Sequence, residues 1–503
     1  MKQSEGDLNK RQLEEETEDS ISKLLINLLA CTFQTVFGYI CLDVCVSISL
    51  HYIGQEISPT ANAGYGFALT CVFILLTPFG FGLNQSLNMH TSQALGDQKV
   101  QLAKRFFNIN LYVMLFILVP LGGLLLILKY PLSLTIREDQ REATSNYSQE
   151  FLYYLIPAII LALEFESAKC FMVAHKVTYP FTIIHFCTLA IHWFLCWLFI
   201  VEFQWGVSGA GIVIIITEVL NIVGLVLFVQ FTNLKREIFQ GTKIIMDVPR
   251  FKKLGVSYIK TSIPIVLHIY SEFFVFFLLS FIALSLGVSE MIAHIGLQNM
   301  CGIYFRIPIS LSIAMMSFVG SEMGKGNIKR AKFYVAAGLV IFAVACVICS
   351  ILIWFFRNQL AIFYASDQEE NELAARAKEI FTDTVPWLIG GMLIVDGLQG
   401  TLSGALKGIN KINLVFYSTI IAYYLICIPL VSFFTYSWGL DQGVVGIWQG
   451  FGISNLILAI LDLIVLFTTD WEKQSRNIVR RVKQENELQF STLVQVEDDK
   501  ANI

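Results

Sequence analysis

The sequence has few charged residues and none of the short motifs that mark common enzymes. Only 15% of its 503 residues are Asp, Glu, Lys or Arg, against 55% hydrophobic residues. No HExxH, GxSxG or phosphate-binding glycine loop occurs. These absences argue against a soluble domain, against a membrane-embedded hydrolase and against transport driven by ATP. We therefore predict no catalytic residue, no metal site and no cofactor.

The cysteines do not form the spaced pairs of a disulfide framework. All eleven lie in or beside apolar stretches, where a thiol packs as a small hydrophobic side chain. We therefore expect free cysteines that serve packing.

The two ends of the chain lack apolar stretches. Residues 1–20 hold seven acids and three bases, which is typical of a solvated acidic tail rather than of a cleaved signal or transit peptide. The polar tail from Trp471 onward is expected to be disordered, apart from a short helix at 478–484.

Long apolar runs fill the rest of the chain. A helix needs about 20 residues to cross a hydrocarbon layer of ~30 Å. Twelve stretches are long enough, and they predict an all-α membrane protein of twelve transmembrane helices. Their expected starts are near Ile21, Ala61, Phe107, Ser148, Pro180, Ser208, Tyr258, Ser289, Phe333, Ala377, Ile412 and Gly443.

The charges between the spans are unevenly distributed. Lys and Arg collect in short cytoplasmic loops. The basic residues around Lys104, between 235 and 260, around Lys329 and at Lys407 and Lys411 all fall on one side if both termini are cytoplasmic. The sequon at Asn146 then lies on the outside, where glycosylation is a hypothesis.

The chain contains two copies of one motif. ALGDQKVQLAKRF, ending at Phe106, matches EMGKGNIKRAKFY, ending at Tyr334, at an offset of 228 residues. Two later matches keep nearly the same offset: Pro157 with Pro386, and Trp205-Gly206 with Trp438-Gly439. Matches in the same order indicate a tandem duplication of roughly 230 residues.

The duplication predicts two six-helix lobes. Six spans return the chain to its starting side, so the two lobes have the same orientation and are related by an axis along the membrane normal. Such lobes around a central cleft are typical of a secondary transporter. The predicted segments are a cytoplasmic acidic tail (1–20), an amino-terminal lobe (21–232), a cytoplasmic linker (233–257), a carboxy-terminal lobe (258–468) and a cytoplasmic tail (469–503).

Three segments resemble the multidrug and toxic compound extrusion (MATE) transporters, in their eukaryotic branch. The segment Gly82 to Asp97, GLNQSLNMHTSQALGD, is similar to the second-helix signature of that family. IPISLSIAMMSFVGSEMGKGN is similar to the eighth-helix signature, and VDGLQGTLSGALKGINKINLVFYSTIIAYYLICIPL to the tenth and eleventh helices. The resemblance covers about 24–468 and implies two lobes and export driven by an ion gradient.

The chain departs from the family pattern at acidic and basic positions. It has Asn88 where many members have an acid, Phe318 where an arginine is usual, and Phe277 at the second glutamate position of the seventh helix. Asn299 stands where some animal members have a glutamate. These differences imply a pathway with fewer acids.

Two carboxyls in the carboxy-terminal lobe are the main site candidates. A charge inside a bilayer costs about 2.5–3.5 kcal/mol on insertion scales, so Glu272 and Asp396 are expected to face protein or water. By resemblance they bind the proton or a cationic substrate; the alternative is a structural hydrogen bond. His268, four residues before Glu272, shares its helix face.

The amino-terminal lobe has weaker candidates. Asp43 lies in the first span, and some prokaryotic family members use an aspartate of that span as their ion switch. The spacing of Glu166 and Lys169 predicts an internal salt bridge. Arg306 and Glu218 are isolated in their spans, and their partners cannot be named from the sequence.

The substrate cavity is predicted to be aromatic. Phe273 and Phe276 flank Glu272, and aromatic faces attract organic cations; lipid contact is the alternative. The remaining predicted lining residues are His268, Asn299, Tyr304 and Gln34.

These features together predict an antiporter. It would export organic cations, drugs or amphiphilic metabolites in exchange for protons or sodium, as a monomer in the plasma, vacuolar or endosomal membrane. No nucleic-acid partner is expected. The alternatives are a lipid or lipid-linked-glycan flippase of the same superfamily, which the scarcity of basic residues in the spans disfavours, and a channel.

Overall fold

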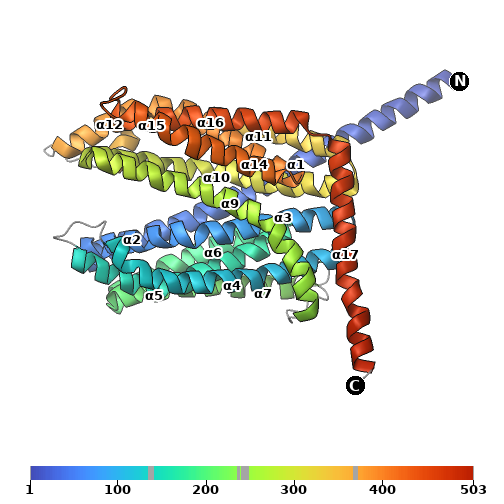
Figure 1. The fold of residues 1–503 in the computed structure, drawn as a ribbon, viewed down its shortest axis with the longest axis horizontal. Helices are drawn as coiled ribbons and strands as arrows, with labels where there is room; N and C mark the ends of the chain where they lie inside the picture. Colours follow the sequence, from blue (N-terminus) through green and yellow to red (C-terminus); the bar gives the residue numbers. More distant parts are fainter. Residues whose placement is uncertain (1, 134–140, 235–237, 240–247, 366–371, 502–503) are drawn as a thin grey trace.

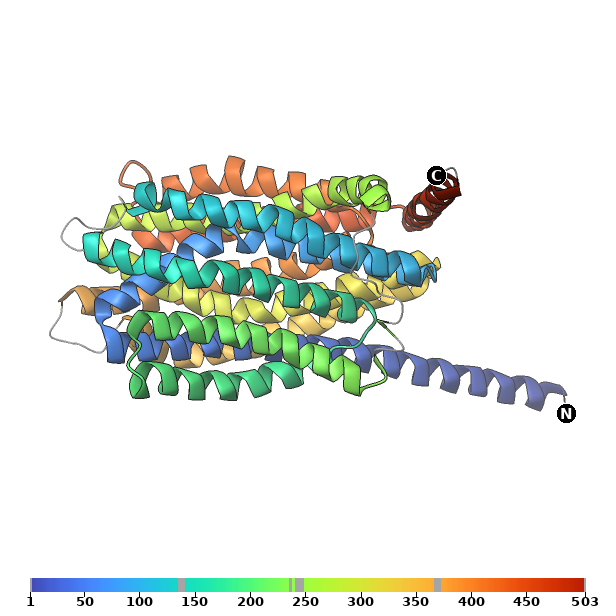
Figure 2. The same ribbon diagram turned by 90° about the horizontal axis from the view of Figure 1, so that it is seen from below.

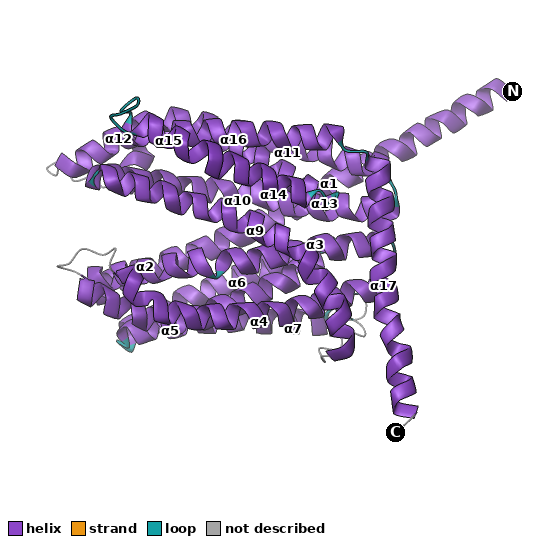
Figure 3. Ribbon diagram, viewed as in Figure 1, coloured by secondary structure: helices purple, strands orange, loops and turns teal. Residues whose placement is uncertain are grey.

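The computed structural model describes the backbone of residues 2–133, 141–234, 238–239, 248–365 and 372–501. Figure 3 shows helices joined by short loops, and no strand occurs within these ranges. Among the described residues, eleven helices or helix runs are long and apolar enough to cross a membrane. A further pair, Thr60–Leu75 and Thr77–Gly96, bends by 44° and completes the predicted twelve spans.

The first six spans are built from α1 (Lys2–Tyr52) with η1 (Ile53–Ile57), α2 (Pro59–Leu75) with α3 (Thr77–Gly96), α4 (Val100–Ser133), α5 (Arg141–Ala174), α6 (Tyr179–Cys196) with η2 (Trp197–Glu202), and α7 (Gly206–Phe231). The second six are α9 (Val248–Leu286), α10 (Val288–Lys325), α11 (Ile328–Ala365), α12 (Glu372–Leu388) with η3 (Ile389–Asp396) and α13 (Gly397–Gly408), α14 (Ile412–Ile420) with η4 (Ile421–Cys427) and α15 (Ile428–Thr435), and α16 (Gly443–Thr468). All eleven cysteines are free.

The helices form two groups. In Figure 1, α2 to α7 make the lower group and α10 to α16 the upper one. Both termini lie at the same end of the molecule, as Figure 2 also shows. We call this end the terminal end. From it the two groups diverge toward the opposite end.

The sequence repeat is also a repeat of backbone conformation. Left-handed residues occur in pairs at the same places in the two lobes: Gln98 and Gly326 after α3 and α10, Lys176 and Asn410 after α5 and α13, and Gly206 and Gly443 at the starts of α7 and α16. Gln98 and Gly326 have the same 228-residue offset as the motif. The structural counterpart of Gly206 is therefore Gly443. It lies four residues after Gly439, with which the sequence match pairs Gly206.

The duplicated motif lies where the lobes touch. A Cβ on Gly96 would lie 2.2 Å from the Ser321 carbonyl oxygen and 2.9 Å from the Gly324 Cα. A Cβ on Gly324 would lie 2.3 Å from the Gln93 carbonyl oxygen. Helices α3 and α10 therefore cross backbone to backbone at the terminal end. Glycine is needed in both copies because no side chain fits between the helices.

Helix α9 belongs to both lobes. It begins at Val248, so its first ten residues occupy what the sequence predicts as linker. Its first half packs on α3 and α4: the Tyr258 hydroxyl donates to Asn110 Oδ1 at 2.8 Å, and Ser262 Oγ lies 2.6 Å from Ser86 Oγ. Its second half packs in the upper group. The change of lobe occurs inside the helix, near Pro264.

Both tails are helical, and the tail from Trp471 onward differs from the expected disorder. Helix α1 runs without a break from Lys2, and α17 covers Trp471–Ala501 instead of a short helix at 478–484. Burial explains α17, because Ile478 and Val482 are 0% and 1% exposed against the body of the protein. A polar sequence with one apolar stripe is helical once that stripe has a surface to cover.

Substitution at the crossing tests this contact. We expect Gly96→Ala or Gly324→Ala to destabilise the protein by about 1–3 kcal/mol, because the methyl group meets backbone that cannot move aside. The measurement is thermal unfolding of detergent-purified protein. Gly123→Ala, whose Cβ would meet nothing within 4 Å, is the control, and equal melting temperatures in all three variants would contradict the close crossing.

Candidate functional site

Three carboxyls gather inside the upper lobe. Glu272 lies on α9, Asp396 at the end of η3 and Asp462 on α16. Asp396 and Asp462 are 2% and 0% exposed, and the Glu272 side chain is 20% exposed. The charge of Glu272 acts on both Asp396 and Asp462. The site thus contains both predicted acids and a third one that the sequence analysis did not select.

A wide helical turn brings Asp396 into the site. The π-helical segment η3 contains Gly391, and a Cβ there would lie 2.6 Å from the Gly452 Cα of α16. Segment η3 and helix α16 therefore approach closely five residues before Asp396. Such π segments are frequent at functional sites. The Tyr423 hydroxyl donates to Asp396 Oδ1 at 3.5 Å, while Asp396 Oδ2 has no partner among the described residues.

His268 lies one turn before Glu272, as predicted from the spacing. Its Nε2 is 3.4 Å from Glu272 Oε1 and 3.1 Å from Ser403 Oγ, and its Nδ1 is 3.0 Å from Thr419 Oγ1. The imidazole is fully buried. Two hydroxyls and one carboxylate therefore hold its orientation.

Lys407 does not lie in a cytoplasmic loop, as its sequence context predicts. Its side chain belongs to α13 and is 2% exposed. Its Nζ donates to Gln85 Oε1 of α3 at 2.6 Å, so it connects the acid-bearing lobe to the other lobe. The fields of Glu272 and Asp462 act on its ammonium. The neighbouring glycines and the KGINK sequence favour a loop, and only packing buries it.

The aromatic candidates have separate surroundings. The Phe276 ring lies 5.1 Å from Phe451 inside the upper lobe. The Phe273 ring lies 4.9 Å from Phe73 of α2, so it faces the other lobe. Tyr304 donates its hydroxyl to the Leu393 carbonyl oxygen at 2.6 Å, which gives it a structural bond next to Asp396.

Asp43 is not part of the acid cluster. Arg306 of α10 donates to both of its carboxylate oxygens, from Nε at 2.8 Å and from Nη2 at 2.6 Å. The side chains are 31% and 32% exposed. This ion pair joins α1 to α10 across the lobes and supplies the partner for Arg306 that the sequence could not name.

Other polar groups of the lower lobe form their own network. The predicted pair of Lys169 and Glu166 is present at 2.9 Å, and the Tyr39 hydroxyl also donates to Glu166, at 2.8 Å. Gln34 accepts from Thr178 and lines a small cavity beside Lys169. Gln34 therefore lies apart from the carboxyl cluster.

Two further candidates of the sequence analysis take other places. Asn299 is exposed on α10. Glu218 accepts from Asn221 at 3.1 Å within α7. Neither residue belongs to the group formed by the three carboxyls, His268 and Lys407.

The carboxyls of the upper lobe lie in apolar and aromatic surroundings. Within the described ranges, no three His, Cys, Asp or Glu side chains are placed to hold a metal ion. The carboxyls are surrounded by aromatic rings and by helices that span the membrane. Buried carboxylates in such surroundings bind a proton or pair with a cation rather than remain as bare charges.

Comparison with known proteins agrees with the two-lobe arrangement. The sequence model of the MatE family matches residues 35–198 and 264–433, once in each half. Protein DETOXIFICATION 14 of Arabidopsis thaliana is 25% identical over 420 residues, covering 82% of this chain and 83% of the relative. Multidrug and toxin extrusion protein 1 of Danio rerio is 20% identical over 426 residues, covering 85% and 69%.

Solved structures share the fold. The crystal structure of the eukaryotic MATE transporter AtDTX14 superposes with a TM-score of 0.81 at 21% identity, covering 92% of this chain and 99% of that one. The Vibrio cholerae MATE transporter VcmN in its bent form has a TM-score of 0.75 at 14% identity, covering 93% and 99%.

A double-mutant cycle tests the ion pair between Asp43 and Arg306. Asp43→Asn leaves a partly buried guanidinium unpaired, and we expect a loss of about 1–2 kcal/mol in unfolding free energy. The exchange of both residues, Asp43→Arg with Arg306→Asp, should recover most of the loss. Thermal unfolding of Asp43→Arg, of Arg306→Asp and of the double variant gives the coupling energy. A coupling energy near zero would show that the pair does not hold the lobes together.

Proposed function

The chain belongs to the MATE family of membrane transporters and is not an enzyme; on that premise we propose that it exports organic cations, drugs or amphiphilic metabolites in exchange for protons, with sodium as the alternative coupling ion. The observation that carries the proposal is the buried carboxyl cluster around Glu272 and Asp396. The printed names of the relatives, which concern detoxification and multidrug and toxin extrusion, support the substrate class.

Exchange follows from competition for one group of carboxyls. A cargo cation neutralises the cluster when it binds from one side of the membrane. Protons that arrive from the other side neutralise the same carboxyls and release the cargo. Because each occupant excludes the other, the two fluxes are coupled. His268 orients Glu272 throughout the cycle.

The lobes supply alternating access. In the structure they meet at the terminal end through Gly96 and Gly324, and they diverge at the other end. We assign the terminal end to the cytoplasm, because the basic loops lie there. The described state is then closed to the cytoplasm, and rocking of the lobes about α9 would open it. We propose a monomer in the plasma, vacuolar or endosomal membrane.

The buried basic residues do not favour a lipid flippase. Lys169 is paired with Glu166, Arg306 with Asp43, and Lys407 with Gln85 and the acid cluster. These three ammonium and guanidinium groups are thus already engaged. Anionic lipid headgroups need positive groups that are free to receive them.

Neutralising the two predicted acids tests the function. We expect the variant Glu272→Gln with Asp396→Asn to lose counterflow, because cargo and protons lose their shared carboxyls. The assay is uptake of a fluorescent organic cation into liposomes that contain purified protein, with proton and sodium gradients imposed separately. Glu218→Gln, which removes a partly buried carboxyl of the other lobe, is the matched control and should transport normally. Wild-type transport rates in the double variant would refute the proposal.

A further inference from the structure

Asp462 is a fully buried acid without a hydrogen-bond partner. Both of its carboxylate oxygens lack a partner among the described residues, and so do both amide atoms of Asn455, two turns earlier on the same face of α16. Such groups are costly to bury unless something satisfies them. An unpartnered carboxylate on a helix packed against η3 and α13 indicates a site that takes a ligand.

Gln399 points to the same place from another helix. It is 0% exposed on α13, and its amide lies beside the carboxyls of Glu272 and Asp462. Neither its nitrogen nor its oxygen completes a hydrogen bond with good geometry. A small cation or protonated carboxyl between Glu272 and Asp462 would give this amide its partner.

The charges of the cluster do not balance. Glu272, Asp396 and Asp462 carry three negative charges when ionised, and Lys407 supplies one positive charge. Burial of two unbalanced charges costs several kcal/mol each in a low-dielectric interior. The three carboxyls are not placed to share a metal ion. Two monovalent cations are therefore required for neutrality.

We propose that Asp462 is a third cation-binding carboxyl and that Lys407 is a tethered counter-ion. Because Lys407 neutralises one of the three carboxylates, the site has a capacity of two monovalent cations. These are either two protons, or one proton and the ammonium group of the cargo. This inference rests on the proposed function. The charged and titratable groups that interact with Asp462 from the surrounding helices are Glu272 of α9, Lys407 of α13 and Tyr423 of η4.

Lys407 connects this capacity to the movement of the lobes. Its hydrogen bond to Gln85 crosses between lobes at 2.6 Å. When the lobes separate at the terminal end, that bond breaks and the ammonium is free to move toward Glu272 and Asp462. There it competes with the bound protons and favours their exchange for cargo that enters from the cytoplasm, so that the net charge of the site does not change. Proton release and opening of the cytoplasmic end are coupled through one lysine.

Counting the protons released by a divalent organic cation tests the proposal. A fluorescent dication is added to detergent-purified protein in weak buffer with a pH indicator. A site with a capacity of two monovalent cations exchanges two protons for each bound dication, and we expect this count in the wild type. Asp462→Asn lowers the capacity to one, so its count should fall by about one. Adding Lys407→Gln to Asp462→Asn returns the capacity to two and should restore the wild-type count, whereas structural damage would not be reversed by a second substitution.

The outcomes separate this inference from the function on which it rests. If the wild type releases protons and Asp462→Asn releases the same number, Asp462 is not part of the site. If the wild type neither binds the cation nor releases protons, the proposed function itself is wrong. Glu218→Gln should match the wild type in every case.

A second inference comes from α17. Figure 1 shows this helix running across the ends of both helix groups, roughly perpendicular to them. It holds the upper lobe through Ser475, which donates to the Met323 carbonyl oxygen at 2.8 Å, and through Gln474, which donates to the Asn410 carbonyl oxygen at 3.2 Å. Both acceptors lie at the terminal end, next to the crossing.

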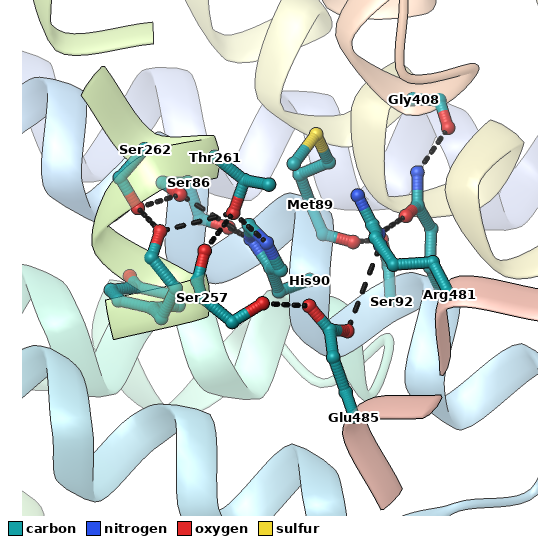
Figure 4. Close-up of polar contacts among 12 residues, drawn as sticks. Ser86, Met89, His90, Ser92, Ser257, Thr261, Ser262, Gly408, Arg481 and Glu485 are labelled. Carbon is teal, nitrogen blue, oxygen red and sulfur yellow. Dashed lines mark hydrogen bonds and ion pairs between the residues drawn. The ribbon is translucent and has the colours of Figure 1, made fainter. Parts of the chain in front are cut away.

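The same helix holds the lower lobe through Arg481. Arg481 donates to Gln93 Oε1 of α3, and Gln93 Nε2 donates in turn to the Gly408 carbonyl oxygen at 2.8 Å. Glu485 pairs with Arg481 at 3.6 Å and accepts from Ser257 of α9 at 3.2 Å. Figure 4 shows Arg481 and Glu485 reaching from α17 toward these partners.

Helix α17 can contact both lobes at once only while the terminal end is closed. Gln93 lies three residues before Gly96, directly at the crossing of α3 and α10. Separation of the lobes would pull Gln93 away from Met323 and Gly408, and α17 cannot keep both sets of bonds. We infer that α17 is a brace that stabilises the state closed at the terminal end and is released when that end opens.

Removal of the Arg481 contact should shift the conformational equilibrium. We expect Arg481→Ala to raise hydrogen exchange at least several-fold in peptides covering 89–97 and 316–325, because the crossing opens more often. Arg480→Ala, which removes the exposed neighbouring arginine, should leave exchange unchanged. Deletion of residues 471–503 is the second variant and should give a larger effect. Unchanged exchange in both Arg481→Ala and the deletion would refute the brace.

Discussion

Charge inside a membrane must be neutralised, and this constraint explains the ion pairs within and between the two lobes. Glu166 is paired with Lys169 inside one lobe, and Asp43 with Arg306 between lobes. Lys407 is held by Gln85. The acid cluster of the upper lobe departs from this pattern, since it has more negative than positive groups. This excess of negative charge makes the cluster a cation-binding site, because a bound cation must supply the positive charge that the protein lacks.

The second constraint is the close approach of α3 and α10. Two glycines allow the backbones to touch, and the bonds of Gln93, Gln85 and Asn88 extend the contact along α3. Most of these bonds join side chains to main-chain oxygens or amides, which can break and form again at modest cost. A contact of this kind closes one end tightly and still permits the lobes to separate.

Helix α9 connects the two constraints. Its first half is bonded to the lower lobe through Tyr258 and Ser262, and its second half carries His268 and Glu272 into the upper lobe. A movement of one lobe against the other must therefore act on the helix that holds the central carboxylate. This connection gives a physical route from the occupancy of the site to the relative position of the lobes.

The sequence by itself determined the twelve spans, the duplication and the acids Glu272 and Asp396, because hydrophobic length, repeated motifs and isolated charges are local properties. It also indicated the pair of Glu166 and Lys169, which are three residues apart on one helix. Only the tertiary structure decided that Asp43 binds Arg306, that Lys407 is buried and that α17 is ordered. Those outcomes depend on partners hundreds of residues away, and no local pattern specifies which surfaces the folded helices bring together.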